Sequence, residues 1–201
     1  MSDPGPLRPP AGSSRYTWIV GAFALMALAY ITLNTLGTDA PGSRGVPKGR
    51  RLPPFAVPLA LSDLKGDAQV DPSKACKVRG PKVLNSCQLA ERGPVAIAFF
   101  ATKSKRCERQ VDVLERARRR FHDVGFAAVS VRGNRDEVRR TARRRGWRMP
   151  VGYDHDGAVT NAYRVAICPT ITFADRGGKV VSTSFALLGE QALAQRLEAI
   201  R

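Results

Sequence analysis

The sequence predicts an α/β domain with a central mixed sheet flanked by helices, behind one N-terminal transmembrane helix. Two continuous apolar runs, residues 94–100 and residues 125–132, have the composition of strands that are covered on both faces. Segments with helical periodicity alternate with these strands, as expected for a sheet with helices packed on it. An uncharged apolar stretch, residues 18–36, precedes the domain and has the length of a helix that crosses a bilayer.

The N-terminal part of the chain divides into three segments. Residues 1–15 are rich in Pro, Gly and Ser, a composition typical of a disordered tail. Residues 16–37 form the predicted transmembrane anchor, whose apolar stretch would be about 28 Å long as a helix, close to a hydrocarbon core of ~30 Å. Residues 38–52 form a Gly- and Pro-rich linker. The domain then occupies residues 53–201.

The apolar stretch has a second interpretation, a cleaved signal peptide. The apolar region of such a peptide is shorter, about 7 to 15 residues, so the length favours a retained single-pass anchor in the cell membrane. Tyr16 and Trp18 stand where interfacial aromatic residues would lie. Basic residues flank the stretch on both sides, so charge alone does not orient it. The four cysteines, an even number, favour an oxidising, extracytoplasmic compartment for the domain.

Three helices of the domain are predicted from apolar residues that recur on one face. The first follows the strand at residues 94–100, the second is the basic segment 135–145, and the third ends the chain. The residues that define these faces are Val111, Leu114 and Phe121 in the first helix, Val138 and Ala142 in the second, and Leu193, Leu197 and Ile200 in the last.

Turn residues mark the remaining elements of the domain. Asp156 can cap a short helix that ends near Tyr163. Residues 170–174 and residues 179–184 are predicted to pair as a hairpin across the turn Asp175-Arg-Gly-Gly.

The chain is strongly basic, with 33 Lys and Arg against 17 Asp and Glu and a formal net charge of +16. Such a charge is compatible with nucleic acid or an anionic membrane as a partner. However, arginines cluster at residues 118–120 and 143–145, near the ends of two predicted helices, where cations suit the helix dipole. No aromatic residues interleave with them to stack on bases. The sequence therefore predicts basic solvated faces and no nucleic-acid partner.

The candidate catalytic residues lie in two segments that are far apart in the sequence. In the first, an apolar strand runs into a polar turn, and Ser104-Lys-Arg-Cys107 opens the following helix. In the second, Cys168-Pro169-Thr170 leads into the first strand of the hairpin. These segments resemble the active-site layout of the thioredoxin superfamily, in which a redox motif at a helix N-terminus faces a cis-proline loop.

The pattern is similar to the TlpA/ResA-like branch of that superfamily and the related redoxins of the AhpC/TSA group, over about residues 52–201. Cys107 matches the second cysteine of their Cys-x-x-Cys motif, residues 163–170 match Tyr-Gly-Val-x-x-x-Pro-Thr, and Asp175-Arg-Gly-Gly-Lys-Val-Val matches their hairpin. Members are typically tethered outside the cytoplasmic membrane and reduce or exchange disulfides. The resemblance implies a thioredoxin-like fold, a cis peptide bond before Pro169, protein thiols or disulfides as partners, and no cofactor.

Ser104 is the departure from this pattern, because it stands where these proteins carry their attacking cysteine. A hydroxyl cannot replace a thiolate in disulfide attack, so exchange within one motif is lost. In this fold the residue before the cis-proline lies against the redox motif, so Cys168 can approach Cys107 and pair with it if their Cα atoms lie within ~7 Å.

The predicted reaction is thiol–disulfide exchange through Cys107. Its position in the first turn of a helix, beside Lys103, Lys105 and Arg106, is an environment that favours a thiolate. In the expected cycle Cys107 attacks a partner disulfide and Cys168 resolves the mixed disulfide. Ser104 would donate a hydrogen bond to the thiolate, and Pro169 would shape the partner groove.

Two other functions remain open on the sequence alone. Peroxiredoxins carry Thr/Ser-x-x-Cys at the equivalent turn, so Ser104 and Cys107 also fit a thiol peroxidase that reacts with peroxide. Phe100 stands where the proline that normally opens that motif would be. The second alternative is a degenerate thioredoxin fold that acts as a binding module, in which a Cys107–Cys168 bond would be purely structural.

The other polar candidates are expected to be structural. Cys76 and Cys87 lie eleven positions apart across a Gly-Pro turn and are predicted to form a structural disulfide. His122 and His155 are the only histidines, and no pair has the spacing of zinc ligands, so no metal is expected. Glu108 and Gln110, the latter at a position where the family often has Glu, are expected to be solvated helix residues.

Overall fold

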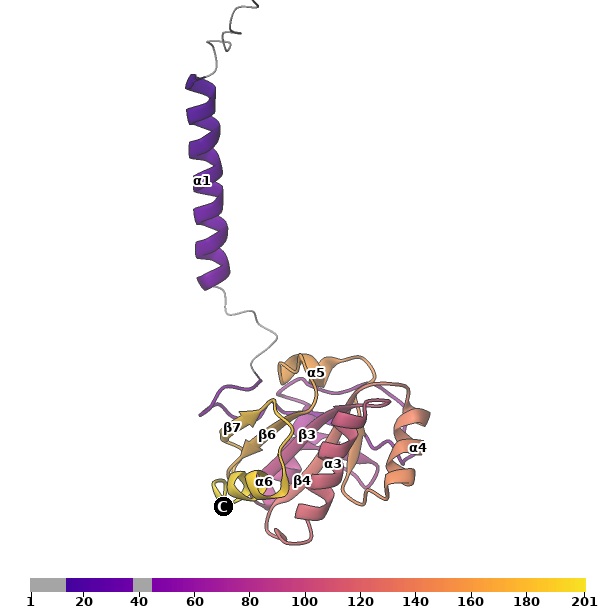
Figure 1. Ribbon diagram of the computed structural model, residues 1–201. Coiled ribbons are helices and arrows are strands. Elements are labelled where there is room, and N and C mark those ends of the chain that lie inside the picture. Colours follow the sequence, from indigo (N-terminus) through magenta and orange to yellow (C-terminus); the bar gives the residue numbers. More distant parts are fainter. Residues whose placement is uncertain (1–13, 38–44) are drawn as a thin grey trace, which may run out of the picture. The chain divides into compact units, whose positions relative to one another are not determined.

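The computed structural model describes the backbone of residues 14–37 and 45–201. The chain forms two units, Met1–Pro41 and Gly42–Arg201, which are described separately (Figure 1). Most of the predicted tail, residues 1–13, and the first half of the predicted linker, residues 38–44, lie outside the described residues.

The first unit contains one helix, α1 (Ser14–Gly37), of 24 residues. Its side chains are described over residues 16–32, and the large apolar ones are exposed, among them Trp18 (81%) and Leu25 (72%). Within the side chains that the structure describes, no helix combines the length and the apolar character needed to cross a membrane. The predicted transmembrane anchor is therefore not confirmed.

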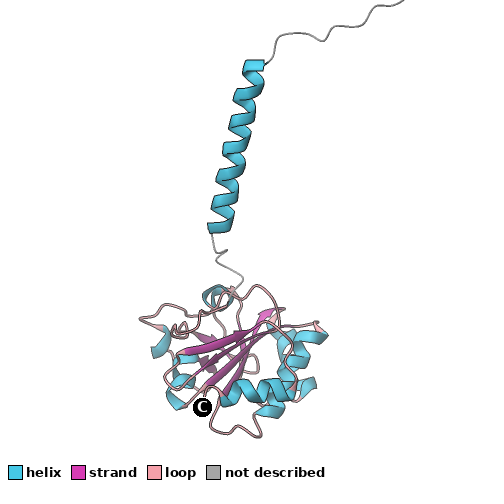
Figure 2. Ribbon diagram, turned by 60° about the vertical axis from the view of Figure 1, so that its left-hand side comes forward, coloured by secondary structure: helices cyan, strands magenta, loops and turns pink. Residues whose placement is uncertain are grey.

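The second unit is built on a five-stranded mixed sheet with the order β5-β4-β3-β6-β7 (Figure 2). The central strand β3 (Val95–Ala101) is parallel to β4 (Gly125–Arg132), and β4 is parallel to β5 (Val151–Tyr153). On its other side β3 is antiparallel to β6 (Thr170–Ala174), which pairs with β7 (Val180–Ser184) in the predicted hairpin. The predicted mixed sheet flanked by helices is confirmed.

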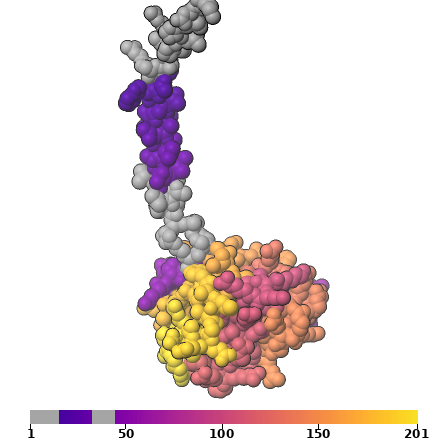
Figure 3. Space-filling view, viewed as in Figure 1, coloured from indigo at the N-terminus to yellow at the C-terminus, as the bar shows by residue number. Residues whose placement is uncertain are grey.

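Helices cover one face of this sheet: α3 (Lys105–Ala117), α4 (Arg135–Arg145) and α6 (Glu190–Glu198). Figure 3 shows α6, α3 and α4 in that order across this side of the domain. Side chains alternate along a strand, so Phe100 faces the core under these helices. Phe121 belongs to the same core although it lies beyond the end of α3.

The opposite face carries shorter elements. They are α2 (Ser86–Arg92), α5 (Ala158–Ala162), the 3₁₀-helix η1 (Ala75–Lys77), and a two-stranded antiparallel sheet of β1 (Ala56–Pro58) and β2 (Val83–Asn85). Phe99, from the other side of β3, packs in this second core with Phe55 and Tyr163.

The second half of the predicted linker, residues 45–52, packs on the domain. Val46 is 5% exposed, and the Leu52 N–H donates to the Gly178 carbonyl at 2.8 Å. Tyr163 also ties the N-terminal segment to the domain, because its hydroxyl donates to the Pro53 carbonyl at 3.0 Å. Burial raises the pKa of the Tyr163 hydroxyl, so this group remains a donor over the whole neutral range.

We expect Tyr163→Phe to lower the free energy of unfolding by about 1 kcal/mol, because it removes the hydrogen bond from the buried Tyr163 side chain to the Pro53 carbonyl. Tyr153→Phe is the matched control, since no hydrogen bond of its hydroxyl is present among the described residues. Urea denaturation of both variants measures the difference. Equal midpoints for the two variants would show that the Tyr163 hydroxyl contributes nothing.

Candidate active site

The sheet brings the two cysteine segments together. Phe99 of β3 pairs with Thr170 of β6 in antiparallel register, so the end of β3 lies beside the beginning of β6. The turn after β3 leads into α3, and the loop before β6 carries Cys168. Cys107 and Cys168 are joined by a disulfide with a Cα–Cα distance of 5.6 Å, although they are 61 positions apart.

The turn between β3 and α3 places a hydroxyl at this disulfide. Lys103 adopts a left-handed backbone conformation with φ of 62°, which is unusual for a residue other than glycine. Ser104 follows as the N-cap of α3, but its side chain makes no capping bond to the helix. Its Oγ donates instead to Cys107 Sγ at 3.0 Å.

Glu108 fixes that turn from within the helix. It is 5% exposed, and its Oε1 accepts the Lys103 backbone N–H at 3.0 Å. Its Oε2 accepts from Arg145 Nη2 at 2.7 Å, and this carboxylate raises the pKa of the Arg145 guanidinium. Glu108 is therefore a buried, paired group rather than the solvated residue that the sequence suggested.

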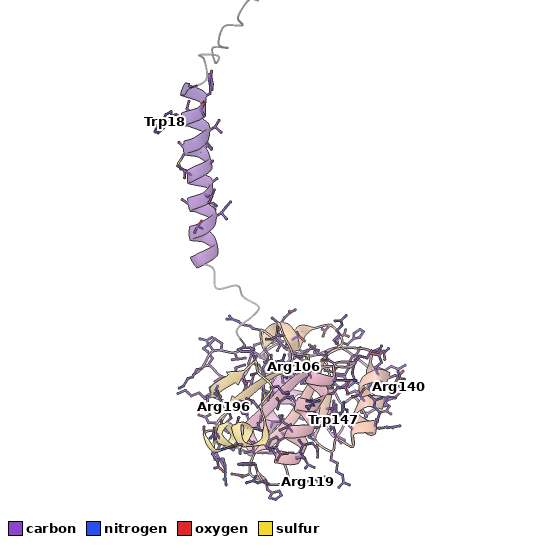
Figure 4. The ribbon with its side chains drawn as sticks, in the orientation of Figure 1. Trp18, Arg106, Arg119, Arg140, Trp147 and Arg196 are labelled. Atoms are coloured by element: carbon purple, nitrogen blue, oxygen red, sulfur yellow. A yellow bond between two sulfur atoms is a disulfide. The ribbon has the colours of Figure 1, made fainter. Side chains whose placement is uncertain are left out.

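Asp112 extends this network to the aromatic core. Arg145 Nη1 donates to Asp112 Oδ2 at 2.9 Å, and Trp147 Nε1 donates to Asp112 Oδ1 at 2.7 Å. Trp147 packs edge-on against Phe100 at 5.2 Å between ring centroids. The start of α3 is thus held to the end of α4 beside the disulfide, and Figure 4 shows Trp147 between these two helices.

Gln110 is also buried, contrary to the expectation for a solvated residue. It has no exposed surface, and its Oε1 accepts the Leu188 N–H at 2.6 Å. Its Nε2 donates to the Leu188 carbonyl at 3.3 Å. Both polar ends of the amide therefore hold the loop before α6, which gives Gln110 a structural role.

The peptide bond between Cys168 and Pro169 is cis, which confirms the expectation from the resemblance. Pro169 is buried, and Thr170 Oγ1 closes the loop by donating to the Ile167 carbonyl at 2.6 Å. The two cysteines of the disulfide differ in exposure, because Cys107 is 1% exposed and Cys168 is partly exposed.

The other two cysteines form a second disulfide. Cys76 in η1 and Cys87 in α2 are bonded with a Cα–Cα distance of 5.4 Å, and both are partly exposed.

His155 lies on the surface, where Nδ1 contacts Asp67 Oδ1 at 2.7 Å, and His122 is exposed. Among the described residues no group of three or more His, Cys, Asp or Glu could hold a metal ion.

Residues 57–183 match the family model described as the AhpC/TSA family. Among curated proteins, the thiol-disulfide oxidoreductase ResA of Geobacillus thermodenitrificans is 29% identical over 109 residues, which are 53% of this chain and 63% of ResA. The chain therefore spans less than two thirds of the length of that relative.

Solved structures with low sequence identity share the fold. A secreted Mycobacterium tuberculosis disulfide oxidoreductase homologous to E. coli DsbE is 16% identical with a TM-score of 0.54, covering 59% of this chain and 89% of that one. Peroxidoxin BcpB from M. tuberculosis is 16% identical with a TM-score of 0.58, covering 79% and 99%. These likenesses confirm the predicted thioredoxin-like fold and carry no argument about activity.

We expect Ser104→Ala to slow alkylation of Cys107 in the reduced protein at neutral pH by about tenfold. The substitution removes the hydroxyl that donates to the sulfur, and a hydrogen bond to a charged group contributes ~1.5–3 kcal/mol. Timed iodoacetamide labelling with peptide mapping measures the rate. Ser104→Thr keeps the hydroxyl and is expected to retain most of the reactivity. The role of the hydroxyl is contradicted if the Ala and Thr variants react alike.

Removing the second disulfide, by Cys76→Ala with Cys87→Ala, is expected to lower the free energy of unfolding by about 2–3 kcal/mol. The bond closes a loop with a sequence separation of 11, and cross-links of this size stabilise chiefly by restricting the unfolded chain. Urea denaturation under non-reducing conditions measures the loss. An unchanged midpoint would show that this disulfide does not stabilise the domain.

Proposed function

The chain belongs to the AhpC/TSA family, and from that membership we propose that it is a thiol–disulfide oxidoreductase acting through the Cys107–Cys168 disulfide. The observation that carries this proposal is the position of the disulfide. It joins the first turn of α3 to the residue before a cis-proline, with the Ser104 hydroxyl 3.0 Å from one sulfur. This hydroxyl can stabilise the Cys107 thiolate once the bond opens, which supports a reactive disulfide.

The surroundings of Cys107 support redox chemistry in the reduced protein. Cys107 is the third residue of α3, where unpaired backbone N–H groups and the helix dipole favour a negative charge. Ser104 adds a donor, and Lys105 and Arg106 add positive charge on the same turn. These groups stabilise a thiolate, which is the form that exchanges with disulfides.

The proposed partners are thiols or disulfides of other proteins. Reduction of insulin by dithiothreitol, followed by turbidity, provides a substrate of this class. We expect the native protein to accelerate the reaction, and Cys107→Ser and Cys168→Ser to abolish the acceleration, since each leaves only one cysteine of this pair.

The matched control is the double variant Cys76→Ala with Cys87→Ala, which retains the Cys107–Cys168 bond and is expected to keep the activity. If the native protein gives no acceleration, the proposed function is wrong. If only the control variant loses activity, the reactive disulfide is Cys76–Cys87 instead.

A second candidate function, a thiol peroxidase, is favoured by the same hydroxyl. In Ser104-x-x-Cys107 the hydroxyl and the sulfur are in contact, as a peroxide-binding cysteine requires. Cys107 would attack the peroxide to give a sulfenic acid and water or alcohol, and Cys168 would displace water to form the disulfide. Stopped-flow mixing of the reduced protein with hydrogen peroxide distinguishes the two functions. Exchange predicts oxidation no faster than that of an ordinary thiol, and peroxidase activity predicts a much faster reaction.

We also propose that α1 holds the domain at a membrane, on an oxidising, extracytoplasmic side. The large apolar side chains described along α1 are exposed, and the domain contains two disulfides, which persist in oxidising compartments. Alkaline carbonate washing of membranes is expected to leave the chain in the pellet. A soluble full-length chain would contradict attachment, and a soluble chain shortened beyond α1 would identify a cleaved signal peptide.

A further inference from the structure

The two cysteines of the Cys107–Cys168 bond are not equally exposed to solvent. Cys107, in the first turn of α3, is 1% exposed and its side chain belongs to the core. Cys168 is partly exposed and follows Ile167, which is 55% exposed. Disulfide exchange requires the attacking thiolate to reach the sulfur with which it bonds. A partner that arrives from solvent therefore meets Cys168.

The surroundings of the two sulfurs also favour attack at Cys168. The sulfur that is not attacked must leave with the electron pair, and a better stabilised thiolate leaves faster. Cys107 has the α3 N-terminus and the Ser104 hydroxyl to stabilise its negative charge. Among the described residues no hydrogen bond reaches Cys168 Sγ. Access and leaving-group stability thus both favour attack at Cys168.

Building on the proposed exchange function, we propose that Cys168 is the sulfur that bonds to the partner and that Cys107 is the resolving sulfur. A partner thiolate forms a bond to Cys168 Sγ, the Cys107–Cys168 bond breaks, and Cys107 keeps the electron pair as a thiolate. A second partner thiolate then attacks the partner's own sulfur and releases Cys168 as a thiolate. The partner leaves oxidised by two electrons, and the protein holds them as two thiols once protonated.

This order reverses the roles predicted from the sequence, where Cys107 attacked and Cys168 resolved. In the reducing direction the same steps run backwards, so Cys168 attacks a partner disulfide and Cys107 then displaces the partner. The physical reason for the reversal is that the substitution at Ser104 removes the exposed sulfur of the usual motif. The remaining partly exposed sulfur belongs to the cis-proline loop.

The charges on the first turns of α3, the helix that carries Cys107, indicate the kind of partner. Lys105, Arg106 and Arg109 are exposed and form no ion pair with any described residue. The neighbouring carboxylates are already engaged, Glu108 by Arg145 and Glu137 by Lys103. Complementary charge speeds association and selects partners. The partner that fits this surface therefore carries acidic residues beside its cysteine.

The test uses the native oxidised protein and three cysteine peptides that differ only in their flanking residues, Glu, Gln or Lys. Each peptide is mixed with the protein, the reaction is quenched with acid, and mass spectrometry locates the peptide on the protein. We expect at least tenfold more peptide on Cys168 than on Cys107, and the fastest labelling with the Glu peptide. Equal labelling, or an excess on Cys107, overturns the assigned order and leaves the exchange function standing.

A pair that no peptide opens overturns the proposed function itself, and the assigned order with it. The Cys76–Cys87 pair is mapped in the same digest, so its opening is not confused with that of the candidate site.

Charge reversal isolates the electrostatic part of the proposal. Arg106, in the first turn of α3, and Arg119, just beyond the end of α3, lie toward opposite ends of the domain (Figure 4). We expect Lys105→Glu with Arg106→Glu to lower the ratio of the Glu-peptide rate to the Lys-peptide rate by about tenfold or more. Arg119→Glu with Arg120→Glu, which makes the same change in net charge, is expected to leave the ratio nearly unchanged.

The ratio cancels any effect of the substitutions on Cys107 as a leaving group, because both peptides react with the same variant. Equal changes in the two variants would show that the net charge of the domain, and not this surface, selects the partner.

Discussion

The antiparallel register of β3 and β6 is the constraint on which the site depends. Pairing of Phe99 with Thr170 puts the end of one strand beside the start of the other. A shift by one residue would turn every side chain of β6 to the opposite face of the sheet. Both faces are packed cores, with Phe100 in one and Phe99 in the other, so the register is strongly specified. The stability of the fold thus fixes the distance between Cys107 and Cys168.

Polar groups then determine the surroundings of Cys107, which the strand register has placed beside Cys168. Lys103 needs a left-handed backbone so that Ser104 can turn its hydroxyl toward Cys107, and Glu108 stabilises that turn through the Lys103 N–H. Arg145 balances the buried carboxylate from the end of α4. The result is a disulfide with unequal ends, one buried and hydrogen-bonded, the other partly open to solvent. Because of this difference, attack by a partner at Cys168, with Cys107 as the leaving thiolate, is the favoured reaction of the bond.

The sequence predicts the parts of this arrangement that depend on local signals. Long apolar runs identify β3 and β4, and Cys168-Pro169 identifies the cis loop through resemblance to a known motif. β1, β2 and β5 have three residues each, too few to show a periodicity, and the sequence did not predict them. The burial of Glu108 and Gln110 was missed for another reason. A polar residue is assigned to solvent unless its partners are known, and Arg145 and Leu188 become partners only in the folded chain.

The central claim is that the Cys107–Cys168 bond is reactive rather than structural, and an equilibrium redox titration tests it most directly. The native protein is equilibrated with glutathione buffers of graded potential, alkylated, and mapped by mass spectrometry. Structural disulfides resist reduction down to potentials below about −300 mV. The account predicts that Cys107 and Cys168 open together, reversibly, at a midpoint well above that value. A pair that stays closed at −300 mV and below would contradict it and identify the domain as a binding module with a locked disulfide.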